Sequence, residues 1–160
     1  MATQDISAAN GSGRPFDIVV WGATGFTGRL VAEYLAKHAG DARWAMAGRS
    51  KDKLEAVRRE LAGRVPSAAD VPILLGDAGD PASLDAITAQ TRVLCATVGP
   101  FAKHGEPVVA ACVRNRADYC DITGEVQFIR AIIDAHHEAA RAAGVRKIGR
   151  ASCRERVSLN

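Results

Sequence analysis

Hydrophobic residues along the chain alternate between short unbroken runs and longer stretches with the spacing of an amphipathic helix. Unbroken apolar runs are typical of central parallel strands, which helices cover on both faces. We expect strands at residues 16–21, 43–48, 71–75, 92–98 and 117–122, with a sixth beginning at 145. Helical spacing predicts helices at residues 26–39, 51–62, 108–115 and 126–143, and one more that begins at 81. This order is typical of an α/β protein with a parallel sheet.

The same pattern predicts how the first half of the chain packs. The first helix carries a stripe of large apolar residues on one face, which we expect to point into the core. These residues are Leu30, Val31, Tyr34 and Leu35. Residues 63–70 are mostly polar or small and are expected to form a loop.

The turn after the first strand has a glycine at every third position, at Gly22, Gly25 and Gly28. A strand, a glycine turn and a helix start in this order are typical of a dinucleotide site, where the pyrophosphate lies at the helix N-terminus. The spacing is G-x-x-G-x-x-G rather than G-x-G-x-x-G. The assignment therefore depends mainly on the position of the glycine turn between a strand and a helix. The alternative is a glycine-rich turn that binds nothing. The predicted cofactor-binding residues here are Gly22, Ala23, Thr24, Gly25, Phe26, Thr27 and Gly28.

The second strand is followed by Arg49 and Ser50, and Arg49 lies 21 residues after Gly28. NAD-binding domains usually place an Asp or Glu near this position, against the ribose hydroxyls. An arginine can instead hold a 2′-phosphate through two hydrogen bonds, which favours NADP over NAD. The alternative is a surface arginine that pairs with helix residues. Ser50 is expected to cap the next helix. Asp77 either accepts a hydrogen bond from the adenine amino group or forms a turn.

The fourth strand ends at Val98 and is followed by Gly99 and Pro100. The carboxyl ends of the first and fourth strands flank the crevice of a doubly wound sheet, so we expect Thr97, Val98, Gly99 and Pro100 to border the nicotinamide half of the cofactor. His104 is either a proton donor or a loop histidine with no role. Residues 123–125 either orient substrate or cap the long helix that follows. No Tyr-x-x-x-Lys pair is present, and we assign no catalytic residue.

Composition restricts the class of protein. The net charge of +3 gives no reason to expect nucleic acid as a partner. No apolar run approaches the roughly 20 residues that span a membrane, and we expect a cytoplasmic protein. Adjacent histidines at 136 and 137 point in different directions on a helix, so no metal site is predicted. Four cysteines form no C-x-x-C pair and are expected to be small buried residues rather than disulfides: Cys95, Cys112, Cys120 and Cys153.

The two ends of the sequence differ from the rest. Residues 1–14 are small and polar and are expected to be a disordered lead-in. Residues 148–160 have no apolar period and look like the translation of a sequencing-adapter oligonucleotide. We therefore expect a Rossmann-type domain at residues 15–147, truncated near its sixth strand, followed by a non-native tail.

Several stretches together resemble the N-terminal half of the saccharopine dehydrogenase-like oxidoreductases, in particular the trans-acting enoyl reductases. They are residues 20–28, 47–50, 98–101, 105–109 and 119–125. The resemblance implies an NADP-binding Rossmann domain followed by a C-terminal substrate domain, and we expect this second domain to be absent from this chain. In the enoyl-reductase branch it implies hydride transfer from NADPH to a carbon–carbon double bond in a lipid or polyketide chain on a partner synthase. Arg49 matches the phosphate-side position, whereas His104 stands where an aromatic residue is expected.

These expectations describe the NADP-binding part of an NADPH-dependent reductase that does not turn over by itself. The alternative is a non-enzymatic NAD(P)-sensing regulatory protein, which would use the same glycine turn and need no catalytic pair. An enzyme like the nucleoside-sugar epimerases is disfavoured because Tyr-x-x-x-Lys is missing.

Overall fold

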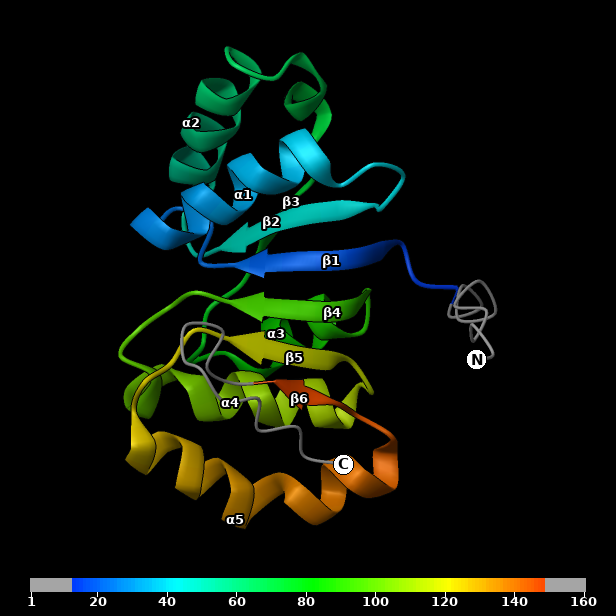
Figure 1. Cartoon of the computed structure of the whole chain (residues 1–160), viewed down its shortest axis with the longest axis vertical. Helices are drawn as coiled ribbons and strands as arrows, with labels where there is room; N and C mark the ends of the chain where they lie inside the picture. The colour runs from blue at the N-terminus through cyan, green and yellow to red at the C-terminus, as the bar shows by residue number, and fades with distance from the viewer. Residues whose placement is uncertain (1–12, 149–160) are drawn as a thin grey trace, which may run out of the picture.

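A six-stranded parallel sheet with the order β3-β2-β1-β4-β5-β6 organises the computed structural model, which describes residues 13–148 (Figure 1). The strands are β1 (Phe16–Trp21), β2 (Trp44–Gly48), β3 (Ile73–Leu75), β4 (Thr91–Ala96), β5 (Asp118–Asp121) and β6 (Lys147–Ile148). The helices are α1 (Phe26–His38), α2 (Lys51–Ala62), α3 (Pro81–Thr88), α4 (Phe101–Arg114) and α5 (Val126–Ala143). The strand order reverses between β1 and β4, which confirms the predicted Rossmann-type doubly wound sheet.

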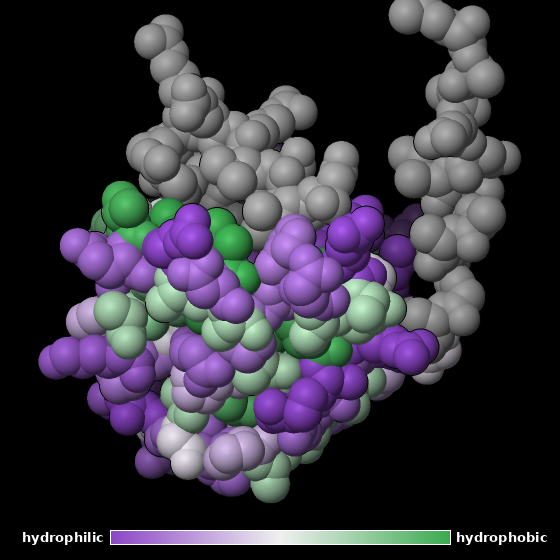
Figure 2. All heavy atoms as spheres, turned by 90° about the horizontal axis from the view of Figure 1, so that it is seen from below, coloured by the Kyte–Doolittle hydropathy of each residue, from purple (hydrophilic) through white to green (hydrophobic). Residues whose placement is uncertain are grey.

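The core consists of two hydrophobic clusters, one on each face of the sheet. Side chains alternate along β1, so Val19 and Trp21 enter one cluster and Val20 enters the other. The first cluster includes residues of α3, α4 and α5, and the second includes residues of α1 and α2. Figure 2, seen from below, shows mostly hydrophilic side chains with smaller apolar areas between them. The apolar side chains of the helices are therefore used mainly against the sheet.

Helix ends follow the capping residues that the sequence offers. The Ser50 side chain accepts a hydrogen bond from the Lys53 amide at the start of α2, and Asp80 does the same for Ala82 at the start of α3. Helix α5 ends at Gly144, whose φ of 69° is the left-handed conformation that glycine adopts without strain. The bounds predicted for α2 and α5 are those observed.

The N-terminal part of α4 was predicted wrongly, and the buried face of α1 was predicted only in part. Helix α4 begins at Phe101 rather than Val108 and contains Pro107 within it. In α1 the small residues Gly28 and Ala32 are buried. Val31 and Leu35 pack against the core as predicted, whereas Leu30 and Tyr34 are 52% and 64% exposed. The helix lies too close to its strand for large side chains on that face. The loop predicted at residues 63–70 contains a short 3-10 helix, Pro66–Asp70.

The predicted boundaries at the two ends also shift. Arg14, expected in a disordered lead-in, inserts its guanidinium among the backbone carbonyls of Thr88, Thr91 and Asn115. Ile148, expected to open the tail, pairs with Cys120 as part of β6. The remaining residues of the lead-in (1–12) and the tail (149–160) lie outside the described part of the chain.

Candidate cofactor site

A cavity of about 320 Å³ lies at the carboxyl ends of the central strands. This is the edge of a doubly wound sheet where the strand order reverses and ligands bind. Its walls come from the ends of β1, β2 and β4, the turns that follow β1 and β3, and the first turns of α4. The lining residues are Trp21, Gly22, Thr24, Gly25, Gly48, Arg49, Asp77, Ala78, Thr97, Val98, Gly99 and His104.

The turn between β1 and α1 is possible only with glycine at two positions. Gly22 has a φ of +90°, and a Cβ there would lie 2.4 Å from Val98 Cγ2. A Cβ on Gly28 would lie 2.1 Å from the Gly22 carbonyl oxygen and 2.8 Å from Ala23 Cα. Helix α1 therefore starts in direct backbone contact with the turn, and this aims its N-terminus at the cavity.

Gly25 has a different position, at the mouth of this turn. It is the N-cap of α1 and is exposed, and no side chain caps the helix. A Cβ there would meet only the Gly22 carbonyl oxygen, at 3.4 Å, and would otherwise occupy open space. An uncapped helix N-terminus with bare backbone at its mouth fits a pyrophosphate, because the N–H groups and the helix dipole attract anions. Thr24 is half-buried beside it and lines the cavity.

Arg49 and Asp77 lie together at the β2–β3 side of the cavity. The Arg49 Nε atom is 3.9 Å from an Asp77 carboxylate oxygen, and the two side chains are 77% and 50% exposed. Such an exposed pair is weak, so the guanidinium is available to a phosphate. The other oxygen of Asp77 accepts a hydrogen bond from the Gly79 amide at 2.7 Å, which is the turn-forming role. Ser50 uses its hydroxyl to cap α2 and does not line the cavity.

The end of β4 is attached to the glycine turn through Thr97, which was expected to border the nicotinamide half. The Thr97 hydroxyl donates to the Trp21 carbonyl at 2.9 Å, and the Thr97 amide donates to the same oxygen at 3.0 Å. Val98 and Gly99 line the cavity as predicted, whereas Pro100 is the N-cap of α4 and does not. His104, expected in a loop, is exposed on α4 and lines the cavity.

Glu125 is the residue whose role the sequence left open and the structure defines. Its two carboxylate oxygens accept hydrogen bonds from the Phe101 amide at 2.7 Å and the Ala102 amide at 2.9 Å. It therefore caps α4, not the helix α5 that follows it. Its own amide donates to the Thr123 hydroxyl, and the Thr123 amide donates to buried Asp121. This chain of bonds fixes the loop after β4, and with it the nicotinamide side of the cavity.

Replacing Glu125 with alanine is expected to lower the free energy of unfolding by about 1.5–3 kcal/mol, because two hydrogen bonds to a charged acceptor are lost at a helix N-terminus. Urea denaturation followed by circular dichroism measures the change. The control is Glu138→Ala on α5, whose side chain is 82% exposed and which should change stability by less than about 0.5 kcal/mol. Equal losses in the two variants would contradict the capping role.

Seven predicted site residues line the cavity: Gly22, Thr24, Gly25, Arg49, Asp77, Val98 and Gly99. The other predicted residues do not line it: Ala23, Phe26, Thr27, Gly28, Ser50 and Pro100. Ala23 and Gly28 are buried under the turn, and Phe26 points outward with 83% of its surface exposed. Thr97, expected to border the nicotinamide half, lines the cavity too, whereas Trp21, Gly48 and Ala78 were missed, although each is a sequence neighbour of a predicted residue. Within the described residues, no three His, Cys, Asp or Glu side chains are grouped to hold a metal ion.

Comparison with known families identifies the cofactor of the domain. Residues 18–148 match the family model of the saccharopine dehydrogenase NADP binding domain. The chain belongs to this family. NADP is therefore the cofactor of the domain, as the sequence predicted. Across residues 13–148, no helix is long and apolar enough to cross a membrane.

Relatives with this NADP-binding domain include two mycobacterial proteins. The chain is 48% identical over 135 residues to the trans-acting enoyl reductases of Mycobacterium leprae and Mycobacterium tuberculosis. In both cases the match covers 84% of this chain and 32% of the relative. The chain thus spans about a third of the length of the relatives it matches.

Solved structures share the fold of the domain. Apo saccharopine dehydrogenase (L-Glu forming) from Saccharomyces cerevisiae superposes with a TM-score of 0.67 at 20% identity, covering 85% of this chain and 27% of that chain. AtPrR2, in a structure with NADP+ and (+)pinoresinol, superposes with a TM-score of 0.55 at 16% identity, covering 86% and 49%. At these identities the likeness concerns the fold alone.

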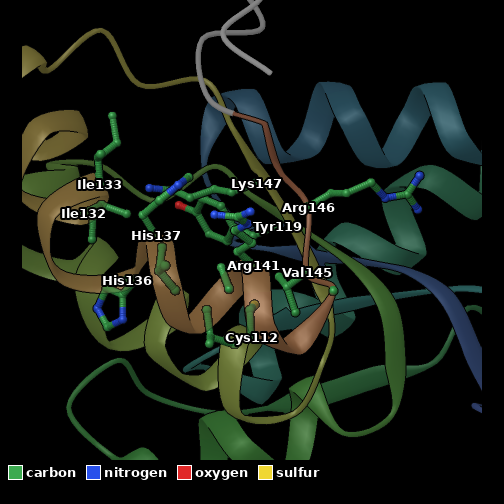
Figure 3. Close-up of a pocket in the computed structure, with 14 residues that line it drawn as sticks. Cys112, Tyr119, Ile132, Ile133, His136, His137, Arg141, Val145, Arg146 and Lys147 are labelled. Carbon is green, nitrogen blue, oxygen red and sulfur yellow. The ribbon is translucent and has the colours of Figure 1, made fainter. Parts of the chain in front are cut away.

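A second cavity of about 210 Å³ lies away from the glycine turn, between α4, α5 and the β5–β6 edge. Figure 3 shows Tyr119 and Lys147, from the two strands, beside Ile132, His136 and His137 of α5. None of the predicted cofactor residues lines it. The Lys147 ammonium lies 5.6 Å from the centre of the Phe128 ring. Burial lowers the pKa of Lys147 from 10.5 to about 8, and the Asp121 carboxylate acts in the opposite direction.

The lowered pKa of Lys147 predicts a pH dependence of stability. Between pH 8 and 10.5 the unfolded chain retains a proton that the folded chain has lost, so the contribution of this residue to stability rises with pH across that window. Lys147→Met removes the effect. Denaturation at several pH values should show the free energy of unfolding of the wild type rising relative to that of the variant as the pH rises from 8 to 10.5. Parallel curves would contradict the assignment.

Proposed function

We propose that this domain holds NADPH for a trans-acting enoyl reductase, in which the nicotinamide reduces a carbon–carbon double bond of an acyl chain. The observation that supports this most strongly is the combination of an uncapped α1 N-terminus and an exposed arginine in one cavity. The similarity to two trans-acting enoyl reductases supports the choice of reaction.

Each part of the cofactor has a proposed place in the cavity. The pyrophosphate lies over the turn from Gly22 to Gly28, at the N-terminus of α1 that no side chain caps. The 2′-phosphate is held by Arg49, next to Ser50 and Asp77. The nicotinamide half lies against Val98 and Gly99, with Pro100 next to them in the chain. Bound NADPH supplies the hydride, and the residues of this chain bind and orient it.

The acyl chain is proposed to be a lipid or polyketide intermediate on a partner synthase. The words trans-acting in the name of the relatives support a substrate that is held on another protein. We place the protein in the cytoplasm. The domain arrangement that we propose is a lead-in, a nucleotide-binding domain and a separate tail. His104 is the titratable side chain nearest to the proposed nicotinamide region among the lining residues, but we assign it no catalytic role.

A chimera tests the proposed reaction. The aligned N-terminal third of the M. leprae reductase is replaced by residues 13–148 of this chain, and NADPH oxidation is followed with an α,β-unsaturated acyl thioester. We expect the chimera to reduce the thioester and to lose most of this activity with Arg49→Ala. A chimera that binds NADPH tightly without oxidising it, beside an active parent, would contradict the reductase and favour the NAD(P) sensor.

A further inference from the structure

We propose that Cys95 and Cys120 form a dithiol site that hydroperoxides oxidise to a disulfide between β4 and β5. The site is independent of the proposed reductase function. It rests on the register of two strands and on the partial exposure of both cysteines.

The register places the two cysteines directly opposite one another. Cys95 of β4 is the Cα partner of Cys120 of β5 in a parallel pair. Neighbouring strands lie about 4.8 Å apart, which falls within the roughly 4.4–6.8 Å that a disulfide requires between Cα atoms. Opposite residues of a parallel pair also project to the same side of the sheet. A disulfide here therefore meets the Cα criterion and requires the two Cβ atoms to approach from about 4.8 Å to within about 4.5 Å.

The face of the sheet that carries the pair is not part of the described core. Leu94, Ala96 and Tyr119 enter the cluster under α3, α4 and α5, so the intervening cysteines point to the opposite side. The cluster under α1 and α2 contains no residue of β4 or β5. Both thiols are partly exposed, whereas Cys112 is buried. The expectation of small buried cysteines thus holds for Cys112 but is wrong for this pair.

The surroundings of the pair favour one nucleophilic thiol. The hydrogen bond from Cys120 lowers the pKa of Cys95, against the opposing effects of burial and of the Asp121 carboxylate. The same hydrogen bond, with burial, raises the pKa of Cys120. Burial also raises the pKa of Cys112, which keeps that thiol protonated and inert. The thiolate is the reactive form of cysteine, so Cys95 attacks and Cys120 resolves.

The reaction balances with a hydroperoxide as the oxidant. The Cys95 sulfur attacks the terminal peroxide oxygen, the O–O bond breaks, and a sulfenic acid forms at Cys95 with release of water or alcohol. The Cys120 sulfur then attacks the sulfenic sulfur, the S–O bond breaks, and a second molecule leaves as water. Two thiols lose two electrons and two protons, and the peroxide is reduced by the same two electrons.

The test uses the 160-residue chain with Cys153→Ser, which removes the one cysteine outside the described residues. The chain is treated with hydrogen peroxide, denatured, and analysed by thiol titration, intact mass and peptide mapping. We expect the loss of two of three thiols, a mass lower by two hydrogens, a monomer, and one linked peptide pair joining Cys95 to Cys120. A dithiol reductant should restore both thiols.

Single variants assign the two roles. Cys120→Ser should accumulate a sulfenic acid at Cys95 that dimedone labels, whereas Cys95→Ser should leave Cys120 unlabelled at the same peroxide dose. Cys112→Ser is the control and should still form the disulfide. Three free thiols after peroxide, a link that involves Cys112, or a covalent dimer would each overturn the proposal.

Discussion

Replacing Gly28 with alanine is expected to destabilise the domain and abolish NADPH binding. The added methyl would lie 2.1 Å from the Gly22 carbonyl oxygen and 2.8 Å from Ala23 Cα. These are backbone atoms of the turn that holds the helix start, so no flexible side chain can move aside. Inserting a methyl group into a packed site costs about 1–3 kcal/mol, and we expect at least the upper end here. Thermal denaturation followed by circular dichroism measures the loss.

Gly25→Ala separates stability from binding at the same turn. Its backbone φ of −76° suits any residue, and the new Cβ meets only one atom, at 3.4 Å. We expect a folded variant whose melting temperature stays close to that of the wild type. Its methyl group projects toward the proposed pyrophosphate, so NADPH affinity should fall at least about tenfold. A stable Gly28→Ala variant, or a Gly25→Ala variant with unchanged affinity, would contradict this description of the turn.

Arg49→Ala is expected to weaken NADPH binding about ten- to a hundredfold and to leave NADH binding nearly unchanged. A hydrogen bond to a charged group contributes about 1.5–3 kcal/mol, and NADH lacks the phosphate that would receive it. The ion pair of Arg49 with Asp77 competes only weakly with binding of the 2′-phosphate, because both side chains are largely exposed. Calorimetric titration with each nucleotide measures the difference.

Arg130→Ala is the matched control for the arginine. It removes the same charge from a side chain that is 74% exposed on α5, a helix that contributes no residue to the cavity. It should change the affinity for neither nucleotide. If Arg49→Ala weakened NADPH and NADH equally, the residue would act through general charge or stability and not through the 2′-phosphate.

The central half of the fold could be predicted from the sequence because local signals agree there. The apolar run of β1, the glycine turn and the amphipathic pattern of α1 all predict the same local structure, a strand followed by a tight turn and a helix. Arg49 and Val98 could be assigned from their places after β2 and β4, since the carboxyl ends of parallel strands meet at one edge.

The parts that could not be predicted depend on contacts between distant residues. The first turns of α4 are capped by Glu125, which lies 24 residues after Phe101. Pro107 and Gly105 have low helix propensity, which locally disfavours a helix over these residues. Gly105 is in fact required, because a Cβ would lie 2.5 Å from the Phe128 ring of α5. The pairing of Cys95 with Cys120 depends likewise on strand register, which composition cannot reveal.

The buried face of α1 shows the limit of periodicity in another way. Helical spacing correctly predicted the helix but assigned four large apolar residues to the core, of which only Val31 and Leu35 pack there. The close contact at Gly28 rotates the small residues inward, and Leu30 and Tyr34 remain largely exposed. Periodicity identifies a helix more reliably than it identifies which of two adjoining faces is buried.

Titration of the wild-type chain with NADPH and with NADH, by calorimetry, tests most directly whether the turn after β1 cradles a phosphorylated dinucleotide. We predict one NADPH per chain and at least about tenfold weaker binding of NADH, in line with one charge-assisted contact to the 2′-phosphate. A folded chain that gave no heat with either nucleotide, or that bound NADH more tightly, would contradict it.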